Sequence, residues 1–227
     1  MAFLTVTGCA QSNYPRQIYN KTTWEFLAES YRHSVPEHKR TIESSLEDGF
    51  ELPYEVRDAP EKGRGVYVIS PIRRGDLIYS GYQHAEFDDE HSFRKFLAQL
   101  PFALQCEILL WAYPMRSPDG GYVVSVELDD GSFINHGNSD REINAFENDE
   151  ICDGMCALRD IEVGEQICMN YTEFISFNSL DWFDEIRSMA WRDVASTSYN
   201  STTEYNQVGL PKSSVEDIPV EAVYGFN

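Results

Sequence analysis

The sequence predicts a mainly β domain with flanking helices and one helical insertion. Short apolar runs of strand length, bounded by glycine and proline, lie between residues 52 and 81 and again between 122 and 169. Apolar residues recur at helical spacing between residues 91 and 113 and again after residue 179. Hydrophobic residues make up 42% of the 227-residue chain, which is enough for one well-buried domain with extensions.

We therefore expect three parts along the chain. Residues 1–51 form an N-terminal helical extension, residues 52–174 form the β domain, and residues 175–227 form a C-terminal helix with a flexible tail. The tail is predicted because Ser, Thr and Asn are frequent beyond Val194, with few residues that could build a core.

The predicted elements follow in order. Thr22 and Thr23 can cap a first helix whose apolar face comprises Trp24, Leu27, Ala28 and Tyr31. The charged run between Pro36 and Asp48 indicates a second helical or loosely packed segment. Strands are then predicted at 52–56, 66–69, 77–79, 122–126, 155–158 and 166–169, with a glycine turn at 59–65 joining the first two.

Two further helices are predicted inside the β domain and one after it. The insertion at about 91–113 contains Phe93, Phe96, Leu97 and Leu100 at helical spacing, and Pro101 begins its second helix. The last helix is predicted to be capped by Ser179, with an apolar face formed by Trp182, Phe183, Ile186 and Met189.

The charge balance disfavours several classes of partner. The chain has 38 acidic and 18 basic residues, which gives a formal net charge of −20 at pH 7. Direct binding of nucleic acid or of an anionic membrane surface needs Lys and Arg, so both are disfavoured. A basic protein or peptide remains open as a partner, and acidic loops at 86–90 or 147–153 could draw it in. The oligomeric state stays open.

The chain also lacks patterns for export, membrane spanning and metal binding. No apolar stretch approaches the roughly 20 residues that span a bilayer, and no signal peptide pattern is evident. Five cysteines without paired spacing predict a reduced, intracellular chain, in the nucleus or the cytoplasm. Cys152 and Cys156 are expected to be small buried thiols, and no metal site is predicted.

Three separated segments carry the functional signal. The first is Lys62-Gly63-Arg64-Gly65-Val66-Tyr67, which continues to Tyr79-Ser80-Gly81. The second is Phe133-Ile134-Asn135-His136, and the third runs from Ala157 through Gly164-Glu165 to Tyr171. In this order and at these separations they resemble the SET domain, a family of S-adenosylmethionine-dependent protein lysine methyltransferases. The resemblance covers about residues 52–174, without the cysteine-rich segments that flank many histone methyltransferases.

The resemblance implies a SET-type β-clip fold and roles for particular residues. The backbone of Gly63 to Gly65 would meet the amino-acid end of S-adenosylmethionine, with Lys62 and Arg64 beside it. The Asn135 side chain and the His136 backbone would hold the amino group and adenine of the donor, in a knot-like threading against the third segment. Each motif also has a structural alternative: a plain hairpin turn, or a buried Asn beside a core His.

Two tyrosines and one tryptophan complete the implied site. Tyr171 matches the catalytic tyrosine of the family, and Tyr79 resembles a second tyrosine that lines the lysine channel. The helix with Trp182 could cover the donor by stacking on adenine, or could simply pack on the core. The chain departs from the family pattern at two places. Family members commonly have a Pro-Asn pair soon after the Asn-His pair, and here the nearest candidate is Asn144, without a proline. Asn170 stands where Asp is common before the tyrosine.

The predicted function is methyl transfer from S-adenosylmethionine to a lysine side chain of a basic protein or peptide. The alternatives are a non-catalytic SET-like module that binds a basic peptide, and an unrelated acidic β-rich scaffold. The sequence leaves open which lysine is the target, whether it lies on a histone, and how many methyl groups are added.

Overall fold

The computed structural model describes residues 6–11, 18–42, 49–60, 62–81, 84–147, 152–176 and 179–192. The predicted flexible tail beyond Val194 lies outside these residues, as do parts of the predicted segment at 36–48 and of the acidic loop at 147–153. Within the described parts of the chain, no helix combines the length and apolar character that a membrane span requires.

In the described residues, ten short strands form four small sheets. Their bounds are β1 Tyr54–Ala59, β2 Gly63–Val68, β3 Leu77–Tyr79, β4 His84–Phe87, β5 Tyr113–Arg116, β6 Tyr122–Glu127, β7 Asn135–His136, β8 Ala145–Glu147, β9 Met155–Ala157 and β10 Cys168–Met169. The sheet orders are β1-β2, β10-β7, β3-β9-β8 and β4-β6-β5, and only the β10-β7 pair is parallel. The predicted strand-rich architecture with accompanying helices is confirmed.

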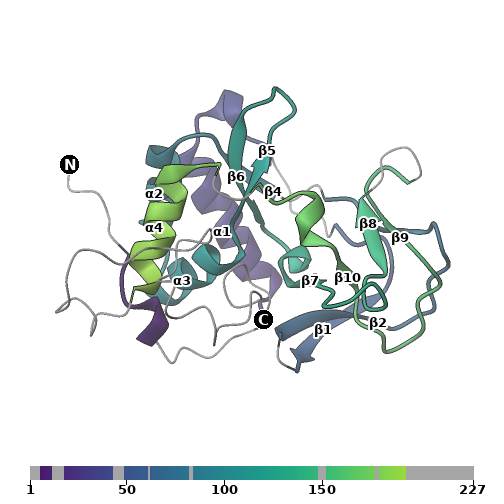
Figure 1. The fold of residues 1–227 in the computed structure, drawn as a ribbon. Coiled ribbons are helices and arrows are strands. Elements are labelled where there is room, and N and C mark those ends of the chain that lie inside the picture. Colours follow the sequence, from purple (N-terminus) through teal and green to yellow (C-terminus); the bar gives the residue numbers. More distant parts are fainter. Residues whose placement is uncertain are drawn as a thin grey trace.

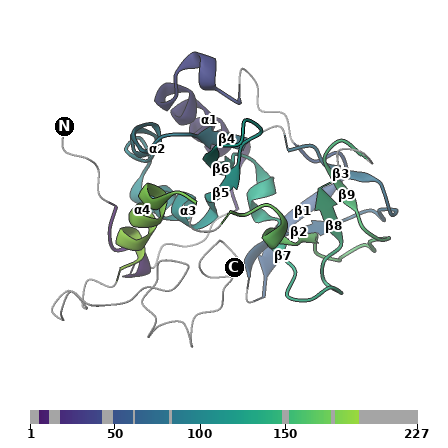
Figure 2. The ribbon, with the colours of Figure 1, turned by 45° about the horizontal axis from the view of Figure 1, so that its top comes forward.

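Four α-helices lie to one side of these sheets. They are α1 Lys21–Ser34, α2 Glu90–Leu97, α3 Phe102–Trp111 and α4 Asp181–Trp191. Figures 1 and 2 show them gathered on one side of the molecule, with β1, β2 and β7 to β9 on the other side and the β4-β6-β5 sheet between the two groups. The described residues also contain four single-turn 3-10 helices. They are η1 Cys9–Gln11, η2 Glu37–Lys39, η3 Asp130–Phe133 and η4 Tyr171–Glu173.

The helix caps differ from the expected ones. The α1 cap is Asn20, whose side chain accepts a hydrogen bond from the Thr23 N–H at 3.0 Å, so the prediction of Thr22-Thr23 as cap is wrong. The α4 cap position is Leu180, without a side-chain hydrogen bond. The Ser179 hydroxyl instead donates to the Ser176 carbonyl at 2.6 Å, so the serine closes the preceding turn and does not cap the helix.

The flanking helices share the core of the β domain. Trp24 and Tyr31 of α1 and Phe183 of α4 belong to the same buried apolar cluster as Val66 of β2 and Ile134 before β7. The predicted apolar face of α1 is buried, and so are Phe183 and Ile186 of α4. The division into parts at residues 51 and 174 stays a prediction.

The cysteines do not match the predicted reduced state. Cys9 of η1 and Cys106 of α3 form a disulfide, and so do Cys152 and Cys156, while Cys168 is free and buried. Cys9 and Cys106 are 97 positions apart, and only the packing of η1 on the helical layer brings them together. No spacing pattern reveals such a pair, which is why the sequence prediction is wrong.

Candidate active site

The glycine turn of the first motif joins β1 to β2. Ala59 faces Gly63 at the end of this antiparallel hairpin, so the turn is shorter than the predicted 59–65 and Gly65 lies within β2. Gly63 has a φ of 78°, a left-handed conformation that glycine adopts without steric cost. Gly65 is needed for space, because a Cβ there would lie 2.0 Å from Nε2 of Gln166. The chain after β9 can therefore lie directly against the backbone of β2.

Lys62 and Arg64 have different surroundings. The buried Lys62 ammonium donates to the His136 carbonyl at 2.9 Å and to a Glu142 carboxylate oxygen at 2.8 Å. Its hydrogen bond holds the pKa of Glu142 below its usual range. Arg64 instead forms a buried ion pair with Glu107 of α3 at 2.5 Å, beside the Phe133 ring. The Arg64 side chain is thus part of the core.

Asn135 and His136 form β7, which pairs in parallel with β10. The buried Asn135 amide donates to the Arg64 carbonyl at 2.6 Å, so this side chain joins the second motif to the first. Asn144 secures the third segment, because its amide accepts from the Cys168 N–H at 2.9 Å and donates to the Gln166 carbonyl at 2.8 Å. The three sequence motifs are therefore brought together.

Tyr171 follows β10 and lies against the second motif. Its backbone N–H donates to Nδ1 of His136 at 3.2 Å, and its hydroxyl donates to the Ile134 carbonyl. Burial raises the pKa of this phenol well above its usual range, so the hydroxyl keeps its proton at neutral pH. The hydrogen bond to the Ile134 carbonyl fixes the direction of this hydroxyl.

A pocket lies beside Tyr171, and five aromatic residues line it: Tyr79, Trp111, Tyr113, Tyr171 and Phe174. These residues come from β3, α3, β5 and the segment after β10, so the pocket lies where the helical insertion meets the small sheets. Tyr79 and Tyr171, the two tyrosines singled out in the sequence, line the same pocket.

Glu127 gives this aromatic pocket an acidic wall, and Asp129, which does not line the pocket, contacts the Tyr79 hydroxyl of that wall. The Tyr79 hydroxyl lies 3.0 Å from a Glu127 oxygen and 2.9 Å from an Asp129 oxygen. The Tyr113 hydroxyl donates to the other Glu127 oxygen at 3.0 Å. Burial, with a contribution from Glu127, raises the pKa of Asp129 to about 7. Burial likewise raises the pKa of Tyr79 and of Tyr113 well above the usual range of a tyrosine.

Sequence reasoning missed Glu127, Asp129, Trp111 and Tyr113. The acidic run at 127–130 lies just before the second motif, and this proximity is the signal that could have found the two carboxylates. The two aromatic residues were assigned only to the helical insertion. Their place in the pocket follows from the turn between α3 and β5, which the sequence pattern does not specify.

The acidic residues expected to form a loop at 86–90 pair with neighbouring basic side chains or cap a helix. Asp88 pairs with Lys39 at 2.5 Å and Glu90 with Arg94 at 2.7 Å, while Asp89 caps α2 by accepting from the Ser92 N–H. Glu86 lies 3.2 Å from His84. From the loop expected at 147–153, the exposed Glu147 does line the pocket.

Trp182 is not brought together with the three motifs. Its ring lies 5.8 Å from that of Phe93 in α2 and 6.0 Å from that of Phe183, centroid to centroid. In both ribbon views α4 lies among the helices, on the other side of the molecule from β7 (Figures 1 and 2). The proposed lid over the donor does not fit this position, because the aromatic face of α4 is packed on the helical layer.

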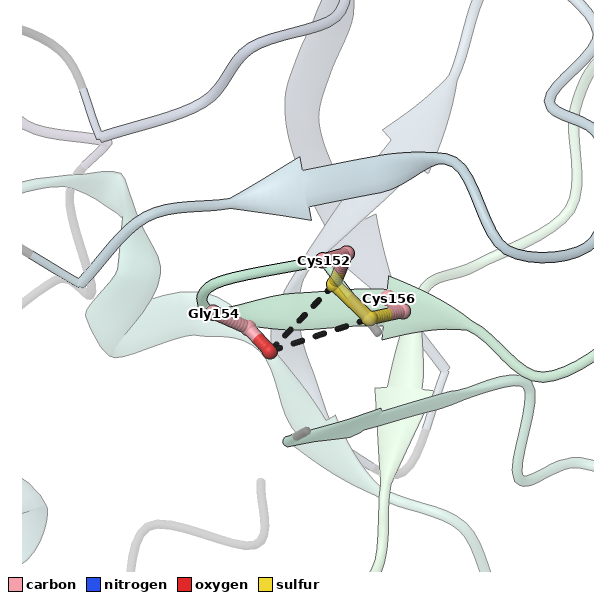
Figure 3. Close-up of a disulfide and its surroundings, with 3 residues drawn as sticks. All are labelled: Cys152, Gly154 and Cys156. Atoms are coloured by element: carbon pink, nitrogen blue, oxygen red, sulfur yellow. Dashed lines mark hydrogen bonds between the residues drawn. A yellow bond between two sulfur atoms is a disulfide. The ribbon is translucent and has the colours of Figure 1, made fainter. Parts of the chain in front are cut away.

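A disulfide lies next to one wall of the pocket. Cys152 and Cys156 are joined around Met155, a pocket residue of β9 that is paired with Tyr79 of β3. Figure 3 shows both sulfur atoms beside the Gly154 carbonyl, and the measured distances are 3.5 and 3.9 Å. The expectation of two unpaired thiols is therefore wrong, and the link constrains the chain at the pocket.

Comparisons with known proteins address the family directly. A family model described as SET domain matches residues 63–172. Solved structures that are similar include a Plasmodium falciparum protein (13% identity, TM-score 0.34, 54% of this chain and 95% of that chain). CpSET8 from Cryptosporidium is 20% identical, with a TM-score of 0.38 over 52% of this chain and 56% of that chain.

A third similar structure is that of the Neurospora SET domain protein DIM-5, a histone lysine methyltransferase, with 16% identity, a TM-score of 0.37 and coverage of 76% of this chain and 88% of that chain. No curated protein sequence matched. The matched family model spans the glycine turn, the Asn135-His136 pair and Tyr171. Residues 63–172 are therefore identified as a SET domain.

Proposed function

We propose that the chain transfers a methyl group from S-adenosylmethionine to a lysine side chain of a basic protein or peptide. The observation that carries this proposal is the pocket in which Tyr171 and Tyr79 meet, directly beside the Asn135-His136 strand. Its aromatic walls and Glu127 suit a long aliphatic stem that ends in a cation. A peptide with such a side chain is attracted to a protein with a formal charge of −20.

The residues of the first two motifs fit the proposed methyl donor. Gln166 Nε2 is buried beside Gly65 with no hydrogen-bond partner, which leaves its two N–H donors for an acceptor such as a carboxylate. The Gly63 to Gly65 backbone, Asn135 and the His136 carbonyl are the groups that would hold S-adenosylmethionine. When bound, this cofactor supplies an electrophilic methyl carbon on a sulfonium.

The role of the protein side chains is to position the amine that accepts the methyl group. A free lysine amine has a pKa near 10.4 and is protonated at neutral pH, so the amine must lose a proton before it can act as a nucleophile. Alignment of two reacting groups contributes greatly to the rate. We assign this role to Tyr171, because it lines the pocket and its hydroxyl is held by the Ile134 carbonyl.

One observation favours the alternative of a non-catalytic module that binds a basic peptide. The Lys62 ammonium already lies on the His136 carbonyl, which is the acceptor implied for adenine. A carbonyl has two lone pairs, so donor binding requires that the acceptor be shared or that Lys62 move. The acidic aromatic pocket could bind a lysine side chain without any methyl donor.

Calorimetry with S-adenosylhomocysteine separates the two functions. Under the main proposal this product, which remains after the donor has lost its methyl group, binds the folded protein, and an array of lysine peptides incubated with labelled S-adenosylmethionine acquires label. Binding of basic peptides without any binding of S-adenosylhomocysteine would favour the alternative. A control array in which each lysine is replaced by norleucine should acquire no label.

A further inference from the structure

Glu127, at the end of β6, is held in one orientation at the wall of the pocket. The side chain is half-buried. One carboxylate oxygen accepts from Tyr113 of β5 and the other from Tyr79 of β3, each at 3.0 Å. A carboxylate has about four lone-pair sites, so two hydrogen bonds leave acceptor capacity for a ligand. The two tyrosines therefore fix the carboxylate without saturating it.

The surroundings of Glu127 select for a cation. Trp111 and Phe174 present aromatic rings, whose faces attract positive charge, and Asp129 shares the Tyr79 hydroxyl with Glu127. We propose that Glu127 is the specificity residue of this pocket, whose carboxylate binds the protonated amine of a lysine side chain. This inference rests on the proposed function, and it names the group that distinguishes lysine from neutral side chains of similar length.

The Glu127 carboxylate also lowers the reactivity of the bound lysine amine. A nearby negative charge stabilises the ammonium and raises the pKa of the bound amine, whereas methyl transfer needs the neutral amine. One N–H bond must break, with its electron pair kept by the nitrogen and its proton released to water. The bound lysine therefore becomes reactive at a higher pH than it would beside a neutral residue.

Other titratable groups also surround Glu127. They come from β3, β4, β5, the turn after β6, η4 and β8, and they are Tyr79, His84, Tyr113, Asp129, Tyr171 and Glu147. Burial opposes protonation of His84, but its contacts with Glu86 and Glu127 dominate and raise its pKa to about 9. Removal of the Glu127 charge also lowers the pKa of His84 and of Asp129, so probe binding by wild type and variant is compared at one fixed pH.

The first experiment measures binding without any methyl transfer. The probes are n-butylammonium and 1-butanol, which share a four-carbon stem and differ in the charge of the head group. Chemical shifts of the methyl groups of Met155 and Met169, which both line the pocket, report binding. We expect wild type to prefer n-butylammonium by about tenfold or more, since hydrogen bonds to charged groups have that worth.

Variants test whether Glu127 is the source of the preference for n-butylammonium over 1-butanol. Glu127→Gln should bind the two probes about equally, whereas Glu127→Asp, which keeps the charge, should retain most of the preference. Glu162→Gln is the control, because it removes an exposed carboxylate that does not line the pocket. The Met115 and Met189 methyl groups, which do not line the pocket, verify folding. An undiminished preference in Glu127→Gln, or no preference in wild type, would overturn the proposal.

The second experiment uses a lysine peptide that the enzyme methylates. Glu127→Gln should raise KM by about tenfold and move the acidic limb of the pH–rate profile to lower pH, which a purely structural role would not do. An unmoved limb contradicts the role of Glu127. If the probes bind as expected but no lysine peptide is methylated, the proposed enzyme function fails while ammonium binding by Glu127 stands.

Discussion

Tyr171 shows how one residue can belong to both the framework and the chemistry. Its backbone N–H is bound to the His136 ring, and its hydroxyl is bound to the Ile134 carbonyl. Both partners belong to the second motif, Phe133-Ile134-Asn135-His136. The chain segment that is implied in donor binding thus also sets the orientation of the phenol. Because the backbone N–H contact does not depend on the hydroxyl, a substitution by Phe can remove the hydroxyl alone.

Tyr171→Phe should lower the rate of methyl transfer by about 100-fold, the scale seen when one positioned hydrogen-bonding group is removed from a reaction site. Affinity for S-adenosylhomocysteine should stay within about twofold, because the ring and the backbone contacts remain. Single-turnover rates and calorimetry measure the two effects. Tyr122→Phe, at an exposed tyrosine of β6, is the control. An unchanged rate in Tyr171→Phe would remove this residue from the reaction.

Asp129 makes stability depend on pH. Burial and the neighbouring Glu127 raise its pKa from 3.8 to about 7, so the folded state binds more protons than the unfolded state between these values. This contribution to stability is fully present below about pH 4 and is lost as the pH rises to about 7.

The free energy of unfolding of wild type, relative to that of Asp129→Asn, should fall by about 1 kcal/mol per pH unit between pH 5 and 7. Urea unfolding of both proteins at each pH measures this difference. Titrating groups that both proteins share cancel in the difference between the two free energies of unfolding. Any pH-independent effect of the substitution adds only a constant to that difference. Parallel pH profiles of the two proteins would show that Asp129 does not carry the proton.

At the scale of elements, regular patterns were predicted well and short pairings were not. The alternating residues of β1 and the apolar face of α1 give clear periods, and both elements are present. The strand β4 also alternates, with Ala85 and Phe87 buried, but its acidic residues resemble a loop. β7 has two residues, which is too short for any period, and only its pairing with β10 makes it a strand, whereas β10 falls within the strand predicted at 166–169.

The element α4 provides a test of the lid hypothesis. Trp182→Ala removes ring contacts with Phe93 and Phe183 and should lower the free energy of unfolding by about 1–3 kcal/mol, less than for a fully buried tryptophan. Affinity for S-adenosylhomocysteine should not change, since α4 lies on the helical side of the molecule (Figure 1). Denaturant titration and calorimetry measure the two. A marked loss of affinity in the folded variant would restore Trp182 to the donor site.

At the scale of the whole molecule, the two disulfides constrain very different lengths of chain. The sequence separation between the paired cysteines is 97 for Cys9–Cys106 and 4 for Cys152–Cys156. Loop-entropy arguments give about 5 kcal/mol for the long link and about 2 kcal/mol for the short one. The double substitution Cys9→Ala with Cys106→Ala should therefore destabilise the protein more than Cys152→Ala with Cys156→Ala. Urea unfolding of the two variants decides, and the reverse order would contradict the argument.

The assembled site shows where sequence reasoning reaches its limit. The order of the three motifs predicted that Gly63 to Gly65, Asn135-His136 and Tyr171 meet, and they do. Arg64 was placed beside the donor, yet its side chain pairs with Glu107 in the core, because a helix 43 positions later supplies a buried carboxylate. The acidic wall formed by Glu127 was missed for a similar reason: its role arises from two tyrosines on other strands.

The parallel pairing of β7 with β10 also has a consequence for how the protein is made. During synthesis Asn135 and His136 leave the ribosome long before Cys168 and Met169, the partners that complete their sheet. The nascent chain must therefore wait with an unpaired second motif, and contacts between distant positions slow folding. Refolding from denaturant should accordingly be slower than for a helical protein of this size, and a chain that ends before Cys168 should fail to form the site at all.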